Sequence, residues 1–258
     1  MSDQKKLTIL SIPFEASTSF LKGTKEGPEA ILNALHAKKN LSLKTTETCD
    51  SDETDPKAME SSTFNAAVET LETGGFPLGL GGEHTVSIGL VRAAKAHTKI
   101  GIVQLDAHAD LRDEYEGNPL SHACAMRRVV ETETPLLGIG VRAMCEEEAM
   151  YVASRDDVNL VDGRLAVFST DWYHQIMNLP PDIYLSIDMD VFDPTDVPAV
   201  GTPEPGGMSY DAVHQFLKHL FKNKNVLAAD IVELRPCEGD ESSVRIAADL
   251  VRLIAELL

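Results

Sequence analysis

Two aspartates and a histidine alternate along Asp106-Ala-His108-Ala-Asp110, directly after the apolar run Ile100–Leu105. A β-strand turns residues i, i+2 and i+4 to one face, so we expect the three side chains to point the same way if the strand continues to Asp110. Three acceptors crowded together repel one another unless a cation lies between them. The spacing therefore predicts a metal site, with a solvated turn as the alternative.

Two further segments place the same kinds of side chain after apolar runs. Asp188 and Asp190 follow Ile183–Ile187, and His84 follows Phe76–Leu80 through Gly81-Gly-Glu. Each motif alone is weak, because Asp often ends strands or caps helices and paired glycines chiefly mark turns. All three nevertheless lie where ligand sites of parallel α/β sheets gather, at the carboxyl ends of strands. The predicted metal ligands are His84, Asp106, His108, Asp110, Asp188 and Asp190.

This ligand set also indicates how many ions it could hold and of what kind. It is larger than the roughly three protein ligands of an open zinc site, and it suffices for two ions about 3.5–4 Å apart if carboxylates bridge them. Carboxylates and imidazoles without a thiolate favour Mn²⁺, although Zn²⁺, Fe²⁺, Co²⁺ and Ni²⁺ remain possible. Two dications, the carboxylates and a bridging hydroxide would leave one negative charge, which favours a cationic group such as a guanidinium nearby.

Apolar runs alternate with helix-like stretches along the chain, which predicts a parallel sheet with helices on both faces. The predicted strands are Leu7–Ile12, Phe76–Leu80, Ile100–Leu105, Pro135–Ile139, Ile183–Ile187 and Val226–Val232. The predicted helices are Pro28–Ala37, Ser61–Thr73, Val86–Ala96, Ser121–Glu131, Cys145–Ser154, Ser209–Lys222 and Ser242–Leu258. Thr45–Glu60 is predicted to be an exposed acidic loop. Because no linker divides the chain, we expect one catalytic domain over residues 1–258.

The composition argues against several classes of protein. With 43% apolar and 25% charged residues, the chain is typical of a soluble enzyme. A net charge of −18 and a pI near 4.7 argue against a nucleic-acid partner. No apolar stretch approaches the roughly 18 residues of a membrane span, and no signal-peptide pattern is visible, so we expect a cytoplasmic protein without a membrane partner. The cysteines lack CxxC spacing, which favours reduced thiols.

Together these motifs resemble the signature segments of the ureohydrolases, the arginase and agmatinase family. The segments that carry the resemblance are Gly81-Gly-Glu-His84, Asp106-Ala-His-Ala-Asp110, Ser186-Ile-Asp-Met-Asp-Val-Phe-Asp-Pro194, Ile12-Pro13-Phe14 and Gly23-Thr-Lys-Glu-Gly27-Pro28. The similarity covers residues 7 to 258 and is closer to agmatinases than to arginases. It implies a three-layer α-β-α fold with a mostly parallel central sheet of about eight strands, and a homo-oligomer, either a trimer or a hexamer.

The resemblance also implies a role for each predicted metal ligand. One Mn²⁺ would be held by His84, Asp106, Asp110 and Asp188, and the other by His108, Asp190 and the bridging Asp106 and Asp188. Asp110 would in addition orient the nucleophilic hydroxide.

Two further catalytic residues are implied in the same way. His122 matches the family's proton-shuttling histidine, and a surface-loop histidine is the alternative. Glu233 matches the carboxylate that pairs with the substrate guanidinium. Because Glu233 ends an apolar run, it needs a partner, and a salt bridge to Arg235 is the alternative.

The implied reaction is hydrolysis of a guanidinium group to urea and an amine. Agmatine, cleaved to putrescine in polyamine biosynthesis, is favoured by the resemblance more than by the loop after Asp110. In that loop Asp113, Glu114 and Glu116 could meet a distal ammonium, whereas Arg112 could bind a carboxylate. An arginase or a guanidino-acid ureohydrolase acting on guanidinobutyrate or guanidinopropionate is thus an alternative.

The Pro- and Gly-rich segment Val200–Gly207 is predicted to be either a pocket wall or a rigid connector.

Two alternatives lie outside the ureohydrolases. The first is a single-zinc, deacetylase-like amide hydrolase, which would need fewer ligands than this chain offers. The second is a degenerate homologue that binds metal structurally or serves as an interaction module, against which the presence of both His122 and Glu233 argues.

We predict that Asp106→Ala lowers the metal content and abolishes turnover, because a bridging ligand serves both ions. Elemental analysis of the purified variant measures the metal bound per chain, and urea release measures turnover. Unchanged stoichiometry together with an unchanged rate would contradict the bridging role.

Overall fold

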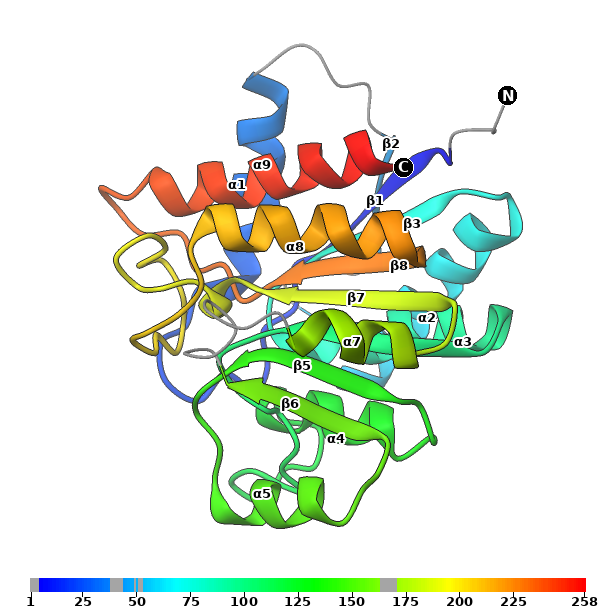
Figure 1. Ribbon diagram of the computed structural model, residues 1–258. Helices are drawn as coiled ribbons and strands as arrows, with labels where there is room; N and C mark the ends of the chain where they lie inside the picture. Colours follow the sequence, from blue (N-terminus) through cyan, green and yellow to red (C-terminus); the bar gives the residue numbers. More distant parts are fainter. Residues whose placement is uncertain (1–4, 38–43, 49, 51–52, 163–170) are drawn as a thin grey trace.

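A parallel β-sheet forms the centre of the molecule (Figure 1). The computed structural model describes residues 5–37, 44–48, 50, 53–162 and 171–258. The strands of this part of the chain are β1 (Leu7–Ile12), β2 (Lys44–Glu47), β3 (Phe76–Gly81), β4 (Ile100–Leu105), β5 (Leu136–Val141), β6 (Val158–Asp162), β7 (Asp182–Asp188) and β8 (Asn225–Val232). They lie in the order β2-β1-β3-β8-β7-β4-β5-β6, and every pairing is parallel.

Helices cover both faces of the sheet (Figure 1). They are α1 (Gly27–Ala37), α2 (Pro56–Glu72), α3 (Ser87–His97), α4 (Ala125–Val130), α5 (Glu146–Ala153), α7 (Asp171–Asn178), α8 (Tyr210–Asn223) and α9 (Ser242–Leu257). Apolar side chains of α1, α7, α8 and α9 form one buried cluster with the sheet. Side chains of α2, α3 and α4 form a second cluster, against which α5 also packs. The predicted three-layer fold with a parallel sheet is therefore confirmed.

The central strands were predictable because they are buried on both faces and read as continuous apolar runs. The edge strands β2 and β6 were not predicted. β2 has the polar sequence Lys-Thr-Thr-Glu, and β6 contains both buried and exposed residues. Edge strands carry polar residues because they must avoid pairing with other molecules. Helix α7 was also missed.

The predicted acidic loop Thr45–Glu60 is wrong at both ends. Its first residues belong to β2, and α2 begins at Pro56 rather than at Ser61. The Asp55 side chain caps this helix by accepting a hydrogen bond of 2.9 Å from the backbone N–H of Lys57. Asp before Pro is a favoured way to begin a helix, because the carboxylate satisfies a free N–H and proline fits the first helical position. Several acidic residues in this segment thus flank regular structure.

Four neighbouring strands, β3, β8, β7 and β4, end at the same edge of the sheet, since all are parallel. The residues that directly follow them contain the predicted site residues His84, Glu233, Asp190 and Asp106. Gly82 allows a close approach at this edge, because a Cβ atom there would lie 2.1 Å from the carbonyl oxygen of Phe14. The fold thereby collects the chemically active segments in one place.

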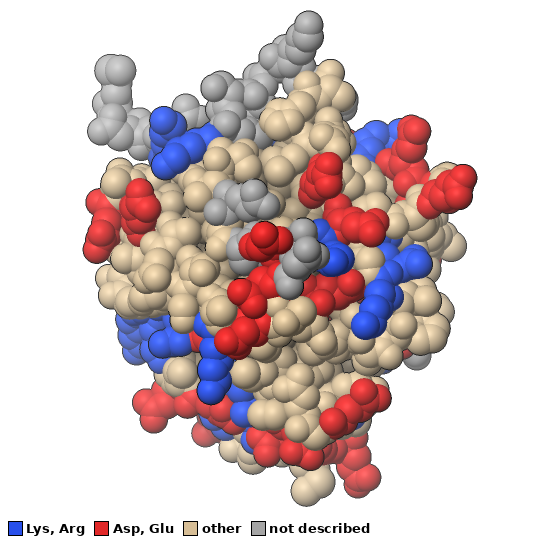
Figure 2. Space-filling model, turned by 180° about the vertical axis from the view of Figure 1, so that it is seen from behind, with Lys and Arg blue, Asp and Glu red and all other residues tan. Residues whose placement is uncertain are grey.

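Charged side chains of both signs are spread over one face of the molecule. On the face seen in Figure 2, Asp and Glu side chains occur in several groups with Lys and Arg between them. No helix among the described residues is both long enough and apolar enough to cross a membrane.

Candidate metal centre and active site

The segment Asp106–Asp110 leaves the sheet instead of extending it, because β4 ends at Leu105. The prediction that its alternate residues share a strand face is therefore wrong. Asp110 has a backbone φ of 54°, in the left-handed region where Asp is among the better tolerated residues. The backbone N–H of Ala143 binds the carbonyl of Ala107 at 3.0 Å and so fixes the curled segment to the residues after β5. The three side chains still meet the other predicted ligands, but through a turn.

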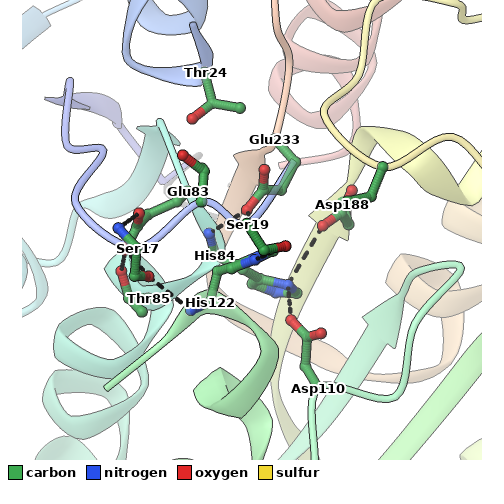
Figure 3. A network of polar contacts seen from close by, with 12 residues as sticks. Ser17, Ser19, Thr24, Glu83, His84, Thr85, Asp110, His122, Asp188 and Glu233 are labelled. Carbon is green, nitrogen blue, oxygen red and sulfur yellow. Dashed lines mark hydrogen bonds and ion pairs between the residues drawn. The ribbon is translucent and has the colours of Figure 1, made fainter. Parts of the chain in front are cut away.

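A first group of ligand atoms surrounds the buried ring of His84. Its Nδ1 atom lies 2.9 Å from Asp110 Oδ2, 3.2 Å from Asp106 Oδ2 and 3.4 Å from Asp188 Oδ2. Figure 3 shows the ring between Asp110 and Asp188. These atoms belong to residues at or just after the ends of β3, β4 and β7, which are not all adjacent in the sheet.

A second group lies around His108. Its Nδ1 atom is 2.8 Å from Asp190 Oδ2 and 3.7 Å from Asp106 Oδ1. Asp106 is thus common to both groups and turns a different oxygen atom to each imidazole. This is the geometry expected of a bridging carboxylate, whereas Asp188 approaches an imidazole only in the first group.

The hydrogen bonds of His84 support a metal site. Ser186 Oγ donates to Asp230 Oδ1 at 2.7 Å, so it can only accept at the 2.9 Å contact with His84 Nε2. Nε2 therefore carries the proton, and Nδ1 keeps a lone pair directed at carboxylate oxygens. This buried atom has no hydrogen-bond partner in the part of the chain that the structure describes. Metal-binding histidines have this tautomer, with the second nitrogen donating to a supporting group.

The aspartates repel one another. Burial, together with the charges of Asp190 and Asp110, raises the pKa of Asp106 to about 7. Burial and the charges of Asp190 and Asp106 raise the pKa of Asp188 well above its usual value. Divalent cations would remove this penalty by stabilising the ionised carboxylates. The donor set and its electrostatics therefore fit a pair of cations.

The imidazoles respond to the same charges. Burial alone would lower the pKa of His108, but the charge of Asp190 and its hydrogen bond raise it to about 10. For His84, burial is likewise outweighed by the negative charges of Asp110 and Asp106, which raise its pKa well above the usual value. Both shifts report a strongly negative potential, which favours cations at this position.

Asp230, buried in the middle of β8, organises the support of His84. Its carboxylate accepts hydrogen bonds from Ser87 at 2.6 Å, from Ser186 at 2.7 Å and from the hydroxyl of Tyr184. Sequence analysis did not identify this residue. The only signal was one Asp within an apolar strand, where a carboxylate needs several donors.

His122 and Glu233 lie beside the metal-ligand groups (Figure 3). Glu233 Oε1 is 3.7 Å from His122 Nδ1 and accepts a hydrogen bond of 2.8 Å from the backbone N–H of His84. Burial, and then the charge of Glu83, raises the pKa of Glu233 well above its usual value. The alternative, a salt bridge between Glu233 and Arg235, does not occur among the described residues, and the Nε atom of Arg235 donates to the carbonyl of Lys22. His122 is almost buried and lines a cavity, so it is not a surface-loop histidine.

A loop near the N-terminus holds His122, and sequence analysis missed this role. Ser19 Oγ lies 3.0 Å from His122 Nε2, and Ser17 Oγ accepts a hydrogen bond of 2.8 Å from the His122 backbone N–H. Glu83 anchors the loop by accepting from the backbone N–H groups of Ala16 at 2.8 Å and Ser17 at 2.6 Å. No spacing or periodicity in the sequence distinguishes these serines from ordinary loop residues.

A cavity of about 550 Å³ opens above the two ligand groups. Thr202 and Glu204 line it, so the segment Val200–Gly207 does form part of the pocket wall. Arg112 also lines it, with its guanidinium 4.9 Å from the centre of the Tyr115 ring. Of the loop acids expected to meet a substrate ammonium, none is among the lining residues, and Asp113 pairs with Arg128 at 2.9 Å.

Comparisons with known proteins agree with this architecture. The model of the Arginase family matches residues 5–256. An N(1)-aminopropylagmatine ureohydrolase from Synechocystis is 34% identical over 253 residues, which cover 90% of this chain and 82% of that protein. An agmatinase from Pyrococcus horikoshii is 35% identical over 239 residues, covering 88% of this chain and 82% of that protein.

Solved structures give the same result. An agmatine ureohydrolase of Thermoplasma volcanium superposes with a TM-score of 0.86 at 25% identity, covering 98% of this chain and 90% of that one. An arginase from Bacillus subtilis, 24% identical, shares the fold with a TM-score of 0.80 and 98% coverage of both chains. The chain belongs to the Arginase family and is an enzyme of the ureohydrolase class. The resemblance inferred from the motifs is confirmed.

A substitution of Ser186 tests whether its hydrogen bond with His84 Nε2 supports metal binding. We predict that Ser186→Ala weakens binding of one divalent ion by about 10–100-fold, as is typical when a group supporting a metal-binding histidine is lost. Titration of the metal-free protein with Mn²⁺ measures the affinity. Ser87→Ala is the matched control, because it removes another hydrogen bond to Asp230 without contacting His84. Equal losses of affinity in both variants would contradict the role of Ser186.

Proposed function

We propose that the protein is a two-metal hydrolase that cleaves the guanidinium group of agmatine to urea and putrescine. The observation that carries the proposal is the position of Asp106, which turns one carboxylate oxygen toward His84 and the other toward His108. A single ion does not need such an arrangement, so it argues against the one-zinc deacetylase alternative.

The proposed ligands of the first ion are His84, Asp106, Asp110 and Asp188, and those of the second are His108, Asp190, Asp106 and Asp188. Mn²⁺ is the proposed metal in both positions, because the ligands are carboxylates and imidazoles without a thiolate, and Zn²⁺, Fe²⁺, Co²⁺ and Ni²⁺ are the alternatives. When bound, the ions act as Lewis acids and generate a nucleophile from water near neutral pH.

The remaining steps fall to side chains of this protein. Asp110 lines the cavity and can accept a hydrogen bond from the attacking water, which fixes its direction. Glu233 can bind the N–H groups of the guanidinium, and the substrate's positive charge would favour the ionised form of this buried carboxylate. This pairing would hold the guanidinium carbon over the two ligand groups.

His122 is the proposed source of the proton that the leaving amine needs. Its ring lies between Glu233 and Ser19, so both nitrogen atoms have a neighbour that keeps the ring in place. An imidazole titrates near physiological pH and can donate and regain a proton in each cycle.

A second candidate substrate is N(1)-aminopropylagmatine, which carries the same guanidinium on a longer polyamine. Its support is the relative from Synechocystis, whose name states this substrate and which is as similar to the chain as the agmatinases are. Arginine and guanidino acids are less well supported, because Arg112, which could bind their carboxylate, stacks on Tyr115 and lies 4.0 Å from Glu148.

Three organisational properties belong to the same proposal. We infer that residues 1–258 act as one catalytic domain, that the chain assembles into a trimer or hexamer, and that it works in the cytoplasm. The match of the family model to residues 5–256 supports the first of these. Light scattering coupled to size-exclusion chromatography measures the second.

The substrate is tested by urea release from agmatine, N(1)-aminopropylagmatine, arginine, guanidinobutyrate and guanidinopropionate, with Mn²⁺ present. We expect the highest kcat/KM with agmatine and two ions per chain by elemental analysis. One ion per chain with turnover of an acetyl-lysine peptide would support the deacetylase alternative instead. Metal-free protein without turnover of any of these compounds would indicate an interaction module.

The proton-transfer role has its own test. We predict that His122→Ala retains both metal ions and lowers kcat by about 10²–10⁴-fold, the usual range for lost acid–base catalysis. His97→Ala, which changes an exposed histidine at the end of α3, is the control. An unchanged rate in His122→Ala would remove this residue from the mechanism.

A further inference from the structure

Glu204 lines the active-site cavity. It belongs to the segment Val200–Gly207, which follows Asp188 and Asp190 in the chain. It is half-buried, and its carboxylate makes no hydrogen bond or ion pair within the described ranges of the chain. The other acids of the cavity that are not predicted metal ligands are already engaged. Glu148 accepts backbone N–H groups of Leu111 and Cys145, both at 2.9 Å, and Glu233 accepts that of His84.

The backbone of Glu204 is fixed by Arg142. The Nε and Nη2 atoms of this guanidinium donate to the Glu204 carbonyl at 3.2 and 2.8 Å. Nη2 also donates to the carbonyl of Asp190 at 2.7 Å. One nitrogen atom therefore holds both the backbone of a predicted metal ligand and the backbone of Glu204, which sets the separation between them.

Within the described ranges, Arg142 contacts the backbone carbonyl of Glu204 and forms no ion pair with its carboxylate. Further hydrogen bonds direct its guanidinium to the carbonyls of Gly140 at 2.9 Å and Phe192 at 3.2 Å, so its donors are used by the backbone. The other arginine of the cavity, Arg112, stacks on Tyr115. Glu204 is left as a carboxyl group without an ion-pair partner among the described residues, on a backbone that Arg142 holds at the cavity wall.

We propose that Glu204 binds the protonated aliphatic amine at the far end of the substrate. The inference rests on the proposed function, because it needs a guanidinium placed over the metal-ligand groups. A short alkyl chain would then span the cavity from Glu233 to Glu204, alongside the partly exposed Met144. The subsite accepts a primary ammonium, as in agmatine, or a secondary ammonium that continues into a longer polyamine.

This assignment predicts selectivity for substrates by both charge and chain length. A guanidino acid of similar length would bring its carboxylate against Glu204 and be repelled. A guanidine with an uncharged tail would lose an ionic hydrogen bond but not meet repulsion. Because Arg142 fixes the Glu204 backbone, the subsite favours one chain length between the guanidinium and the amine.

The test compares Glu204→Gln with the unchanged enzyme on agmatine, N(1)-aminopropylagmatine and butylguanidine, an analogue without the amine. We expect kcat/KM for both amines to fall about tenfold, mainly through KM, because an ionic hydrogen bond outside the reacting centre is lost. Butylguanidine turnover should stay within about twofold. Glu72→Gln, which makes the same change at an exposed position outside the cavity, is the matched control and should behave like the unchanged enzyme.

Charge reversal gives a second measurement. Glu204→Lys should raise kcat/KM for guanidinobutyrate relative to agmatine by more than about tenfold. Equal losses on agmatine and butylguanidine, or an unchanged substrate preference in Glu204→Lys, would overturn the subsite. If the unchanged enzyme releases no urea from any guanidine, the proposed function itself fails, which is a different outcome from urea release without an effect at Glu204.

Discussion

Mutual repulsion among buried aspartates is the constraint on which the site depends. Asp106, Asp188 and Asp190 are almost completely buried, and a carboxylate in such a place requires either a proton or a cation. The imidazoles of His84 and His108 face these oxygens and cannot satisfy them all. Support from Ser186 and Asp230 holds the His84 ring so that its lone pair points at the carboxylates. The surroundings are therefore organised for positive charge before any substrate arrives.

Parallel strands make this concentration of charge possible. The carboxyl ends of neighbouring parallel strands lie side by side, so the short turns that follow them bring their side chains together without long loops. A residue directly after a strand already lies at the site. Glu233 illustrates this, because it follows β8 directly and takes a left-handed backbone conformation with a φ of 63°. Its N–H then binds the carbonyl of Gly82 at 2.8 Å, so the turn after β8 supports the turn after β3.

The central strands and the six candidate metal ligands could be predicted from the sequence, because each is marked by a short segment of the chain. The strands are apolar runs, and the ligands follow those runs closely. Asp and His residues that alternate after apolar runs can be interpreted from two rules alone: the two-residue periodicity of strands, and the gathering of ligand sites at the carboxyl ends of parallel strands. The reason for their convergence was only partly right, since Asp110 reaches the site through a turn and not along a strand. Ser19, Asp230 and Glu204 could not be found in this way. Their roles arise from contacts between residues far apart in the chain, or from a cavity that exists only after folding.

Strand order has a consequence for how the protein is made. The last strand, β8, lies between β3 and β7, so it alone joins the first three strands to the remaining four among the described residues. His84 belongs to one of these halves and the aspartates to the other. During synthesis from the N-terminus, the sheet can therefore become continuous only after β8, which ends at Val232, has been made. Until then the edges of β3 and β7 that will face β8 have unpaired backbone N–H and C=O groups, which are a template for pairing with other chains.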